Sequence, residues 1–297
     1  MARAETRSGT HRDLSRWFFD TGWRHVFAIG AVLFAIFPLV WVVSAAFSSG
    51  SLSSQTLIPE ETTLNNFRVL MSELGHPPFC RWFLNSMTVG VVTAFGTVFL
   101  CACAAYSFSR LRFKGRRAGM MALLLVQMFP NLLAMVALFL FMTRVKSMFP
   151  AIGLGTVWGL IFIYLGGALG VNTWLMKGFF DTLPRELDES AKVDGATHAQ
   201  IFFKIILPLG APVLAVIGLL SFITSQAEFL LADVILGQNN DQRTLAVGLS
   251  RYILAGFSNR WGVFAAGALI GAIPVVVIFL FLQRFIVSGL TSGAVKG

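Results

Sequence analysis

Charged side chains are scarce in this chain. Asp, Glu, Lys and Arg make up 12% of its 297 residues, whereas a soluble domain carries roughly 25%. Hydrophobic residues account for 56%. This composition excludes an ordinary soluble domain and predicts an integral membrane protein. The net charge of +9 does not indicate nucleic-acid binding, because the basic residues are dispersed among apolar stretches, as membrane proteins place them.

Residues that commonly build catalytic and cofactor sites are also few. The cysteines Cys80, Cys101 and Cys103 form no disulfide framework, and the last two point to different sides of one apolar helix. The four histidines are scattered along the sequence, so no metal site is predicted. No glycine is followed by lysine, which excludes a phosphate-binding loop of the G-x-x-x-x-G-K type. We therefore expect a non-catalytic chain that binds no cofactor itself, and if ATP is used, another chain binds it.

Long apolar runs, in contrast, recur along the whole sequence. A polar segment, 1–24, precedes a first run that is longer than the roughly 7–15 residues of a signal-peptide core, so we expect it to be retained. Each run is close to the roughly 20 residues that cross a bilayer. The six predicted spans cover residues 25–47, 84–107, 118–142, 152–176, 209–236 and 263–285. They define one transmembrane domain, 25–290, followed by a short tail, 291–297.

The distribution of Lys and Arg predicts the orientation of these spans. With the N-terminus in the cytoplasm, 16 of the 23 basic residues lie on that side, as the positive-inside rule requires. Both termini and the segment 177–208 are then cytoplasmic. The outer side carries two loops, about 48–83 and 237–262, and the second contains a short helix, 244–253, expected to lie at the surface. These loops either dock an external partner or only connect spans.

The cytoplasmic segment 177–208 is polar and lies between two apolar spans. Pro184 and the acidic residues after it favour a helix that starts at about Thr182. Gly195 ends this helix, and Thr197 with Gln200 forms a capping-box pattern that starts a second one, expected to end at Pro208. The sequence therefore predicts two short helices joined by a glycine turn, which project from the membrane.

A few polar residues lie within the predicted spans. Gln127 and Asn131 flank Pro130, which is expected to kink the third span. Ser221, Thr224 and Glu228 lie in the fifth. Polar groups are costly in lipid and tend to face a bundle interior or a watery path. These five residues are candidates for a substrate pathway; the alternative is that they only form hydrogen bonds between helices.

The cytoplasmic segment resembles a motif of a known family. Its residues Glu189, Ser190, Ala191, Gly195, Ile205, Leu207 and Pro208 follow the E-A-A-x3-G-x9-I-x-L-P spacing found in permease subunits of ATP-binding-cassette importers, with Ser190 in place of the middle alanine. The similarity extends to carbohydrate importers of the maltose and maltodextrin type through 174–180, 227–229, 244–248 and the closing 289–297. It covers nearly the whole chain.

This resemblance implies an all-α integral membrane protein with the six-helix type I importer permease fold and a cytoplasmic coupling-helix loop, 177–208. Glu189 and Asp194 would be surface contacts with an ATPase. The implied partners are a second, maltose-permease-like subunit, two ATPase subunits that bind ATP and Mg²⁺, and an extracytoplasmic sugar-binding protein, in a bacterial cytoplasmic membrane. The implied cargo is maltose, a maltodextrin, trehalose or a related oligosaccharide.

Two other kinds of protein share the composition. A stand-alone secondary transporter or channel would be expected to show intramembrane carboxylates and two related halves, whereas this chain offers Glu228 and no evident repeat. A purely structural membrane subunit is the third reading. Neither explains the cytoplasmic segment.

Overall fold

The structure is a computed structural model that describes residues 21–49, 59, 61–72, 78–237, 239–254 and 260–294. Within these ranges the chain is helical, with an isolated antiparallel bridge between Ser48 and Thr62 in place of any strand. The expected polar segment 1–24 lies outside the described residues except for 21–24, and so do residues 295–297 of the expected tail.

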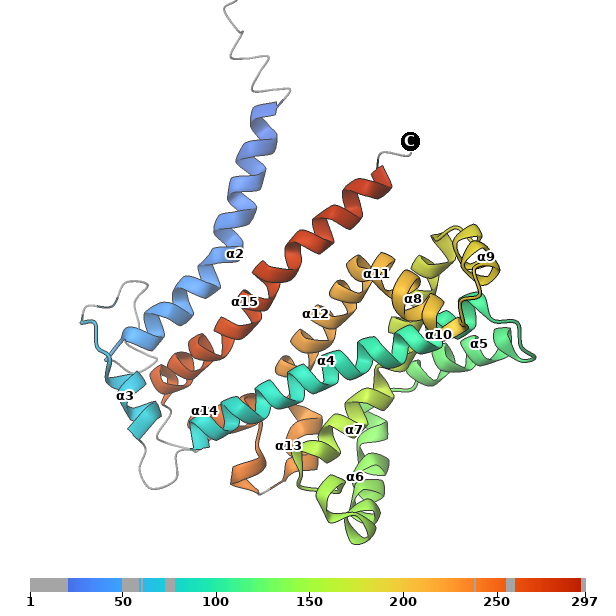
Figure 1. Ribbon diagram of the computed structural model, residues 1–297. Helices are drawn as coiled ribbons and strands as arrows, with labels where there is room; N and C mark the ends of the chain where they lie inside the picture. The colour runs from blue at the N-terminus through green and yellow to red at the C-terminus, as the bar shows by residue number, and fades with distance from the viewer. Residues whose placement is uncertain are drawn as a thin grey trace, which may run out of the picture.

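The helices follow one another along the chain with short connections (Figure 1). They are α2 (Trp23–Phe47), α3 (Asn65–Ser72), α4 (Pro78–Arg110), α5 (Arg116–Gln127), α6 (Asn131–Met148), α7 (Val157–Gly167), α8 (Leu169–Thr182), α9 (Glu186–Val193), α10 (His198–Ile201), α11 (Leu207–Leu209), α12 (Ala211–Ala227), α13 (Leu230–Leu236), α14 (Leu245–Leu254) and α15 (Trp261–Ala294). Short 3₁₀ turns lie at Pro150–Ile152 and Asn240–Gln242, and a π-helical segment at Phe202–Ile206.

The described helices provide three membrane-spanning candidates, or the predicted six if each bent pair is counted as one span. Helices α2, α4 and α15 are each long and apolar enough to cross a bilayer alone. The other three spans are bent pairs: α5 with α6, α7 with α8 at an angle of 50°, and the segment His198–Leu209 with α12 at 77°. The first bend lies at Pro130, which caps α6 in an extended conformation, so the predicted kink is confirmed.

Two predicted helix ends were wrong. Pro208 does not end a helix, because it lies in the first turn of α11, where the missing N–H costs no hydrogen bond, and the break comes at Gly210. The fifth span does not run unbroken to residue 236. It ends at Ala227, and α13 follows as a separate short helix.

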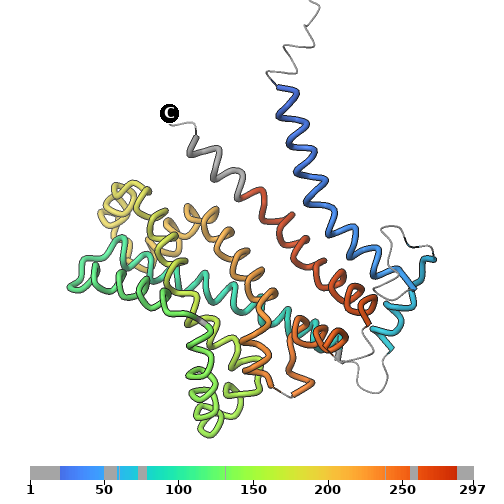
Figure 2. The backbone as a smooth tube through the Cα atoms, turned by 180° about the vertical axis from the view of Figure 1, so that it is seen from behind, coloured from blue at the N-terminus to red at the C-terminus, as the bar shows by residue number. Residues whose placement is uncertain are grey.

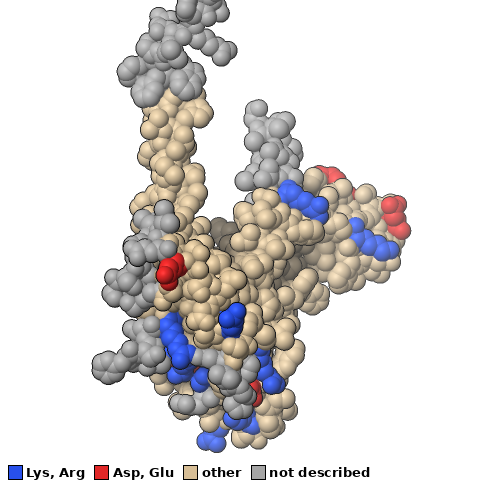
Figure 3. All heavy atoms as spheres, turned by 90° about the vertical axis from the view of Figure 1, so that its left-hand side faces the viewer, with Lys and Arg blue, Asp and Glu red and all other residues tan. Residues whose placement is uncertain are grey.

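Helix α4 is the centre of the packing, since α8 lies along one part of it and α12 along another. Helix α2 stands at the side of the molecule, in contact with α15 at its C-terminal end and diverging from it toward the N-terminus (Figures 1 and 2). Its buried residues are confined to Ser44, Ala45 and Ala46. In the face shown in Figure 3, charged atoms gather near the two ends of the molecule and apolar and neutral atoms cover the part between them, as expected for a membrane protein.

The predicted short helix near residues 244–253 is confirmed as α14, but it does not lie on the surface. It packs against α15 and α4, and Leu245 and Leu249 are buried. A Cβ atom on Gly271 or Gly267 of α15 would come within 2.5 Å and 2.4 Å of these two leucine side chains. The two glycines therefore allow the close approach of α14 to α15.

Candidate functional site

The loop 177–208 is built around a glycine turn. Helix α9 ends at Val193, and Gly195 takes a φ of +80°, a left-handed conformation that glycine adopts at little cost. Its N–H donates to the carbonyl of Lys192 at 3.0 Å, and the N–H of Ala196 donates to that of Ala191 at 2.9 Å. The predicted turn is confirmed, and it reverses the chain between α9 and α10.

The predicted start of α9 was wrong. Helix α8 continues through Thr182, and Leu183 then becomes extended, with φ −74° and ψ 133°. Pro184 explains this, because a proline disfavours the helical conformation in the residue before it. Helix α9 begins two residues after the proline, at Glu186.

The start of α10 agrees with the prediction. The N–H of Thr197 donates to Oε1 of Gln200 at 2.8 Å, and the N–H of Gln200 donates to Oγ1 of Thr197 at 3.3 Å. This reciprocal capping box fixes the direction in which the chain leaves the glycine turn.

The motif residues divide between an inner and an outer face of the loop. Ala191 is buried, and with Ile201, Phe202 and Ile206 it joins a hydrophobic cluster that includes Tyr106 of α4. The exposed residues are Glu189, Ser190, Val193, Asp194 and Pro208. Val193 is 89% exposed. Ile205 and Leu207 are half-buried. The inner face thus holds the loop on the bundle, and the outer face presents two carboxylates around an apolar tip.

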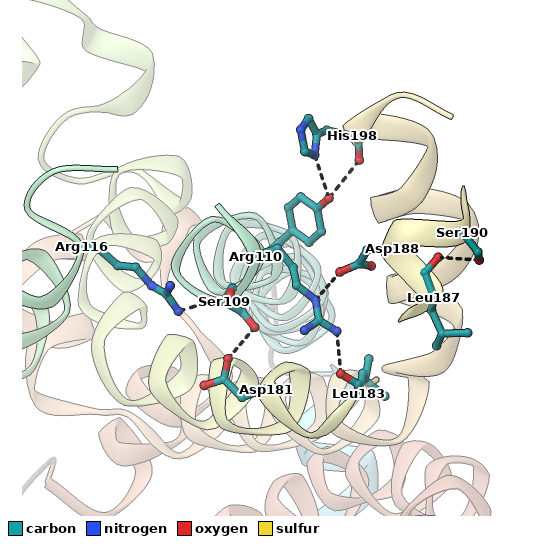
Figure 4. A network of polar contacts seen from close by, with 10 residues as sticks. Ser109, Arg110, Arg116, Asp181, Leu183, Leu187, Asp188, Ser190 and His198 are labelled. Atoms are coloured by element: carbon teal, nitrogen blue, oxygen red, sulfur yellow. Dashed lines mark hydrogen bonds and ion pairs between the residues drawn. The ribbon is translucent and has the colours of Figure 1, made fainter. Parts of the chain in front are cut away.

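A buried ion pair anchors α9 to the end of α4. Nε of Arg110 lies 2.7 Å from Oδ2 of Asp188, and the two side chains are 5% and 9% exposed. The same guanidinium donates from NH2 to the carbonyl of Leu183 at 2.9 Å (Figure 4). Arg110 therefore holds both α9 and the extended residue before it, using the forked geometry that distinguishes arginine from lysine.

Neighbouring contacts extend this anchor to α8 and α5. Ser109 Oγ donates to Oδ1 of Asp181 at 2.6 Å, and Arg116 donates to the carbonyl of Ser109 at 3.2 Å (Figure 4). Asp181 also pairs with Lys177 one turn earlier. Sequence reasoning missed Ser109, Arg110 and Asp181. The signal was present at Arg110, the first residue of the basic run after the second span, but that run was interpreted as an orientation signal alone.

Helix α10 has its own contact with α4. The hydroxyl of Tyr106 lies 3.4 Å from the carbonyl oxygen of His198, to which it donates, and 3.4 Å from Nδ1 of the same residue. The Tyr106 ring packs against Phe202 at 5.1 Å between centroids. Both halves of the loop are thereby attached to the same helix.

The polar residues of the spans do not form one cluster. Gln127 bridges the break between α7 and α8: its Nε2 donates to the carbonyl of Gly167 at 2.6 Å, and its Oε1 accepts from the N–H of Val171 at 3.2 Å. Ser221 has a buried Oγ with no hydrogen-bond partner among the described residues, and Thr224 is exposed. The side chain of Asn131 lies outside the described part of the structure. Whether these residues line a pathway stays a prediction.

The carboxylate of Glu228 is engaged within the chain. Its oxygens accept from the N–H groups of Leu231 and Ala232 at 2.7 and 2.8 Å, which caps α13, and Oε2 accepts from the hydroxyl of Tyr164 at 2.6 Å. Glu228 therefore joins α12, α13 and α7 at the C-terminal end of the fifth span.

We expect Tyr164→Phe to lower the free energy of unfolding by about 1.5–3 kcal/mol, because the phenol is a hydrogen-bond donor to a charged group. Thermal unfolding of the detergent-solubilised protein measures this. Thr143→Val is the matched control, since that hydroxyl bonds only to its own helix, at Phe139. An unchanged unfolding temperature would show that the bond between Tyr164 and Glu228 does not stabilise the fold.

Comparison with known proteins identifies the family. The family described as "Binding-protein-dependent transport system inner membrane component" matches residues 97–292, from the middle of α4 into the end of α15. This chain belongs to that family. The match contains the loop 177–208 and its contacts on α4, Tyr106, Ser109 and Arg110, and it leaves α2 outside.

Relatives of similar length share more than a third of the sequence. The galactooligosaccharides transport system permease protein GanQ of Bacillus subtilis is 40% identical over 263 residues, which cover 88% of this chain and 90% of that protein. The maltose/maltodextrin transport system permease protein MalG of Escherichia coli is 38% identical over 283 residues, covering 92% and 95%.

Solved structures share the fold. A chain of a bacterial ABC transporter involved in the import of the acidic polysaccharide alginate superposes with a TM-score of 0.72 at 22% identity, over 93% of this chain and 99% of that one. The same kind of transporter in complex with an alginate pentasaccharide-bound periplasmic protein gives a TM-score of 0.67 at 18% identity. The type I permease fold expected from the sequence is thus confirmed.

Proposed function

We propose that this chain is the transmembrane permease subunit of an ATP-binding-cassette importer for a carbohydrate, and that it forms half of the translocation pathway. The observation that carries this proposal is the cytoplasmic loop, which exposes Glu189, Val193 and Asp194 while Ala191 and Asp188 fix it to the bundle. A loop that is fixed to the bundle on its inner face and charged on its outer face can bind a partner protein and transmit the partner's movement to the bundle.

The partners follow from the same proposal. Two ATPase subunits bind ATP and Mg²⁺ and receive this loop and that of a second permease subunit, and an extracytoplasmic sugar-binding protein delivers the cargo. The chain itself is non-catalytic. Both termini and the loop lie in the cytoplasm, in the orientation that the excess of basic residues favours.

The proposed cargo is maltose, a maltodextrin, trehalose or a related oligosaccharide. Support comes from the relatives, whose names specify galactooligosaccharides in one case and maltose and maltodextrin in the other. Specificity is shared with the binding protein and the second permease.

We place Gln127, Asn131, Ser221, Thr224 and Glu228 along the sugar path. Ser221 supports this placement most directly, because its buried hydroxyl has no partner among the described residues and a sugar hydroxyl would supply one. Gln127 and Glu228 already use their polar atoms within the chain, so they would shape the path by positioning helices.

We expect Asn131→Leu and Ser221→Ala each to reduce sugar uptake by roughly tenfold, equivalent to about 1.4 kcal/mol for one lost hydrogen bond. Uptake of radiolabelled sugar into cells that contain equal amounts of each variant measures this. Thr143→Val, a surface hydroxyl of α6 bonded to its own helix, is expected to transport normally. Unchanged transport in both variants would remove these two residues from the path.

The experiment that tests the function is co-purification of the tagged chain from its native membrane, followed by mass spectrometric identification of its companions. ATPase activity is then measured with candidate sugars and the binding protein. Recovery of an ATPase and a second permease, with hydrolysis stimulated by one sugar, is the expected result. Recovery of this chain alone, with sugar or ion flux in liposomes without ATP, would show a stand-alone secondary transporter or channel.

A further inference from the structure

Helix α4 runs without a break from one end of the bundle to the other. It has 33 residues, Pro78–Arg110, and is therefore about 50 Å long. The spans packed against it are interrupted: α7 and α8 meet at a 50° bend, and the span that contains α12 bends by 77°. Figure 1 shows α4 passing between the cytoplasmic loop near α9 and α10 and the opposite end near α14.

The outer end of α4 is bonded to the segment before α14. Trp82 Nε1 donates to the carbonyl of Asn240 at 2.9 Å, and Asn85 Nδ2 donates to the carbonyls of Asp241 and Arg243 at 2.8 and 2.9 Å. At the next residue, Ser86 Oγ accepts from the N–H of Leu245 at 2.7 Å. Three side chains of one helix therefore bond to four backbone groups of residues 240–245.

The inner end of the same helix is bonded to the coupling loop. As described above, Arg110 holds Asp188 and the carbonyl of Leu183, and Ser109 holds Asp181. Both sets of contacts belong to a single unbroken helix. The two segments that they hold lie on opposite sides of the membrane.

The covalent routes out of the coupling loop are interrupted. Toward α8 the chain becomes extended at Leu183, before Pro184. Toward α12 it passes through the π-helical segment Phe202–Ile206 and then the break at Gly210. Breaks of this kind absorb rotation, since an extended residue or a helix break transmits torque poorly compared with a continuous helix. The loop is therefore held on the bundle by its non-covalent contacts with α4, which include those of Arg110 and Tyr106.

We propose that α4 is a transmembrane rod that transmits displacement of the coupling loop to the outer segment 239–254, with Arg110 and Asn85 as the positioning residues at its two ends. The inference rests on the proposed function, because the displacement originates in ATP binding by the partner. The inference adds the path of this movement to the proposed function. The movement reaches the outer face through α4 and not through the bent spans. The outer segment and the coupling loop then change position together.

The test follows both ends of the rod in the purified complex, reconstituted in lipid nanodiscs. An environment-sensitive bimane label is attached to Leu254→Cys at the outer end or to Ala199→Cys at the inner end, in a Cys80→Ser background that removes the exposed native thiol. Leu254 is 67% exposed and Ala199 is exposed. Emission is recorded before and after ATP, Mg²⁺ and vanadate trap the closed ATPase, and both labels are expected to respond in the otherwise unmodified chain.

The variant Asn85→Leu removes two of the hydrogen bonds at the outer end, and Arg110→Gln removes the buried ion pair at the inner end. In both, we expect the outer response to fall at least fivefold, while the inner label in Asn85→Leu responds normally. Arg110→Gln is the decisive variant because the substitution lies a full helix length from the outer label. The emission of that label before ATP is added should therefore be the same as in the unmodified chain. If that variant does not assemble, Arg110→Met combined with Asp188→Leu takes its place.

The matched controls are Thr88→Val, whose hydroxyl bonds to Leu84 of its own helix, and Arg112→Gln, an exposed member of the same basic run. Both should respond as the unmodified chain does. A full outer response in Asn85→Leu or in the assembled inner-end variant would overturn the rod. Absence of an ATPase partner, or of any response in the unmodified chain, would instead refute the proposed function.

Discussion

Replacing Gly195 with proline is expected to reduce ATP-dependent sugar uptake on the order of a hundredfold while the subunit still inserts in the membrane. Proline fixes φ near −65°, whereas Gly195 has a φ of +80°. It also removes the N–H that donates to Lys192. The chain cannot then reverse between α9 and α10, so the outer face of the loop is displaced from its partner.

The space around Gly195 makes this a clean experiment. A Cβ atom at this position would have no neighbour within 4 Å beyond the two adjacent residues, so the effect comes from the local backbone and not from crowding by other elements. Gly195→Asn is the matched variant, because asparagine tolerates the left-handed conformation, and we expect it to retain most of the uptake. Gly178→Ala, in α8 with equally open surroundings, controls for loss of a glycine. Normal uptake by Gly195→Pro would contradict the assignment of this loop to energy coupling.

The second large effect concerns the buried ion pair. Asp188→Leu leaves the Arg110 guanidinium buried without its partner, and we expect a loss of about 3–5 kcal/mol in the free energy of unfolding. Arg110→Met combined with Asp188→Leu should recover most of this loss, because an apolar pair of similar volume needs no compensating charge. The unfolding temperature of the three proteins in one detergent measures both effects.

An exposed pair provides the comparison. Arg81 and Asp241 lie 3.9 Å apart, with side chains 62% and 65% exposed, so Asp241→Asn is expected to cost no more than about 1 kcal/mol. If Asp188→Leu proved as mild as Asp241→Asn, Arg110 would not depend on Asp188 and the anchor of α9 would have to lie elsewhere, in the apolar contacts of Ala191.

The sequence predicts those parts of the structure that local rules determine. The number of spans, the kink at Pro130, the turn at Gly195 and the capping box at Thr197 each depend on a few neighbouring residues, and all are confirmed. The prediction that Pro208 ends a helix was wrong, because a proline suits the first turn of a helix as well as the position after its end. Neighbouring residues alone do not distinguish the two positions.

The contacts that hold the site could not be predicted, because they join distant parts of the chain. Arg110 and Asp188 are separated by two complete spans, and nothing in either local sequence identifies the other as its partner. For the same reason α14 was expected at the surface: its amphipathic pattern does not reveal that α15 offers two glycines opposite its leucines. Glu228 drew attention as an intramembrane carboxylate, whereas its cap on α13 depends on the break after Ala227, which the sequence did not indicate.

The packing of α2 against α15 has a consequence for biosynthesis. These are the first and last spans, and about 200 residues separate them in the chain. A ribosome that adds about 5–20 residues per second needs on the order of ten to forty seconds to make that length. During this interval α2 stands in the bilayer without its partner helix. Nascent chains that stop before α15 would therefore display an orphan first helix, which a membrane protease can recognise as the mark of an unfinished subunit.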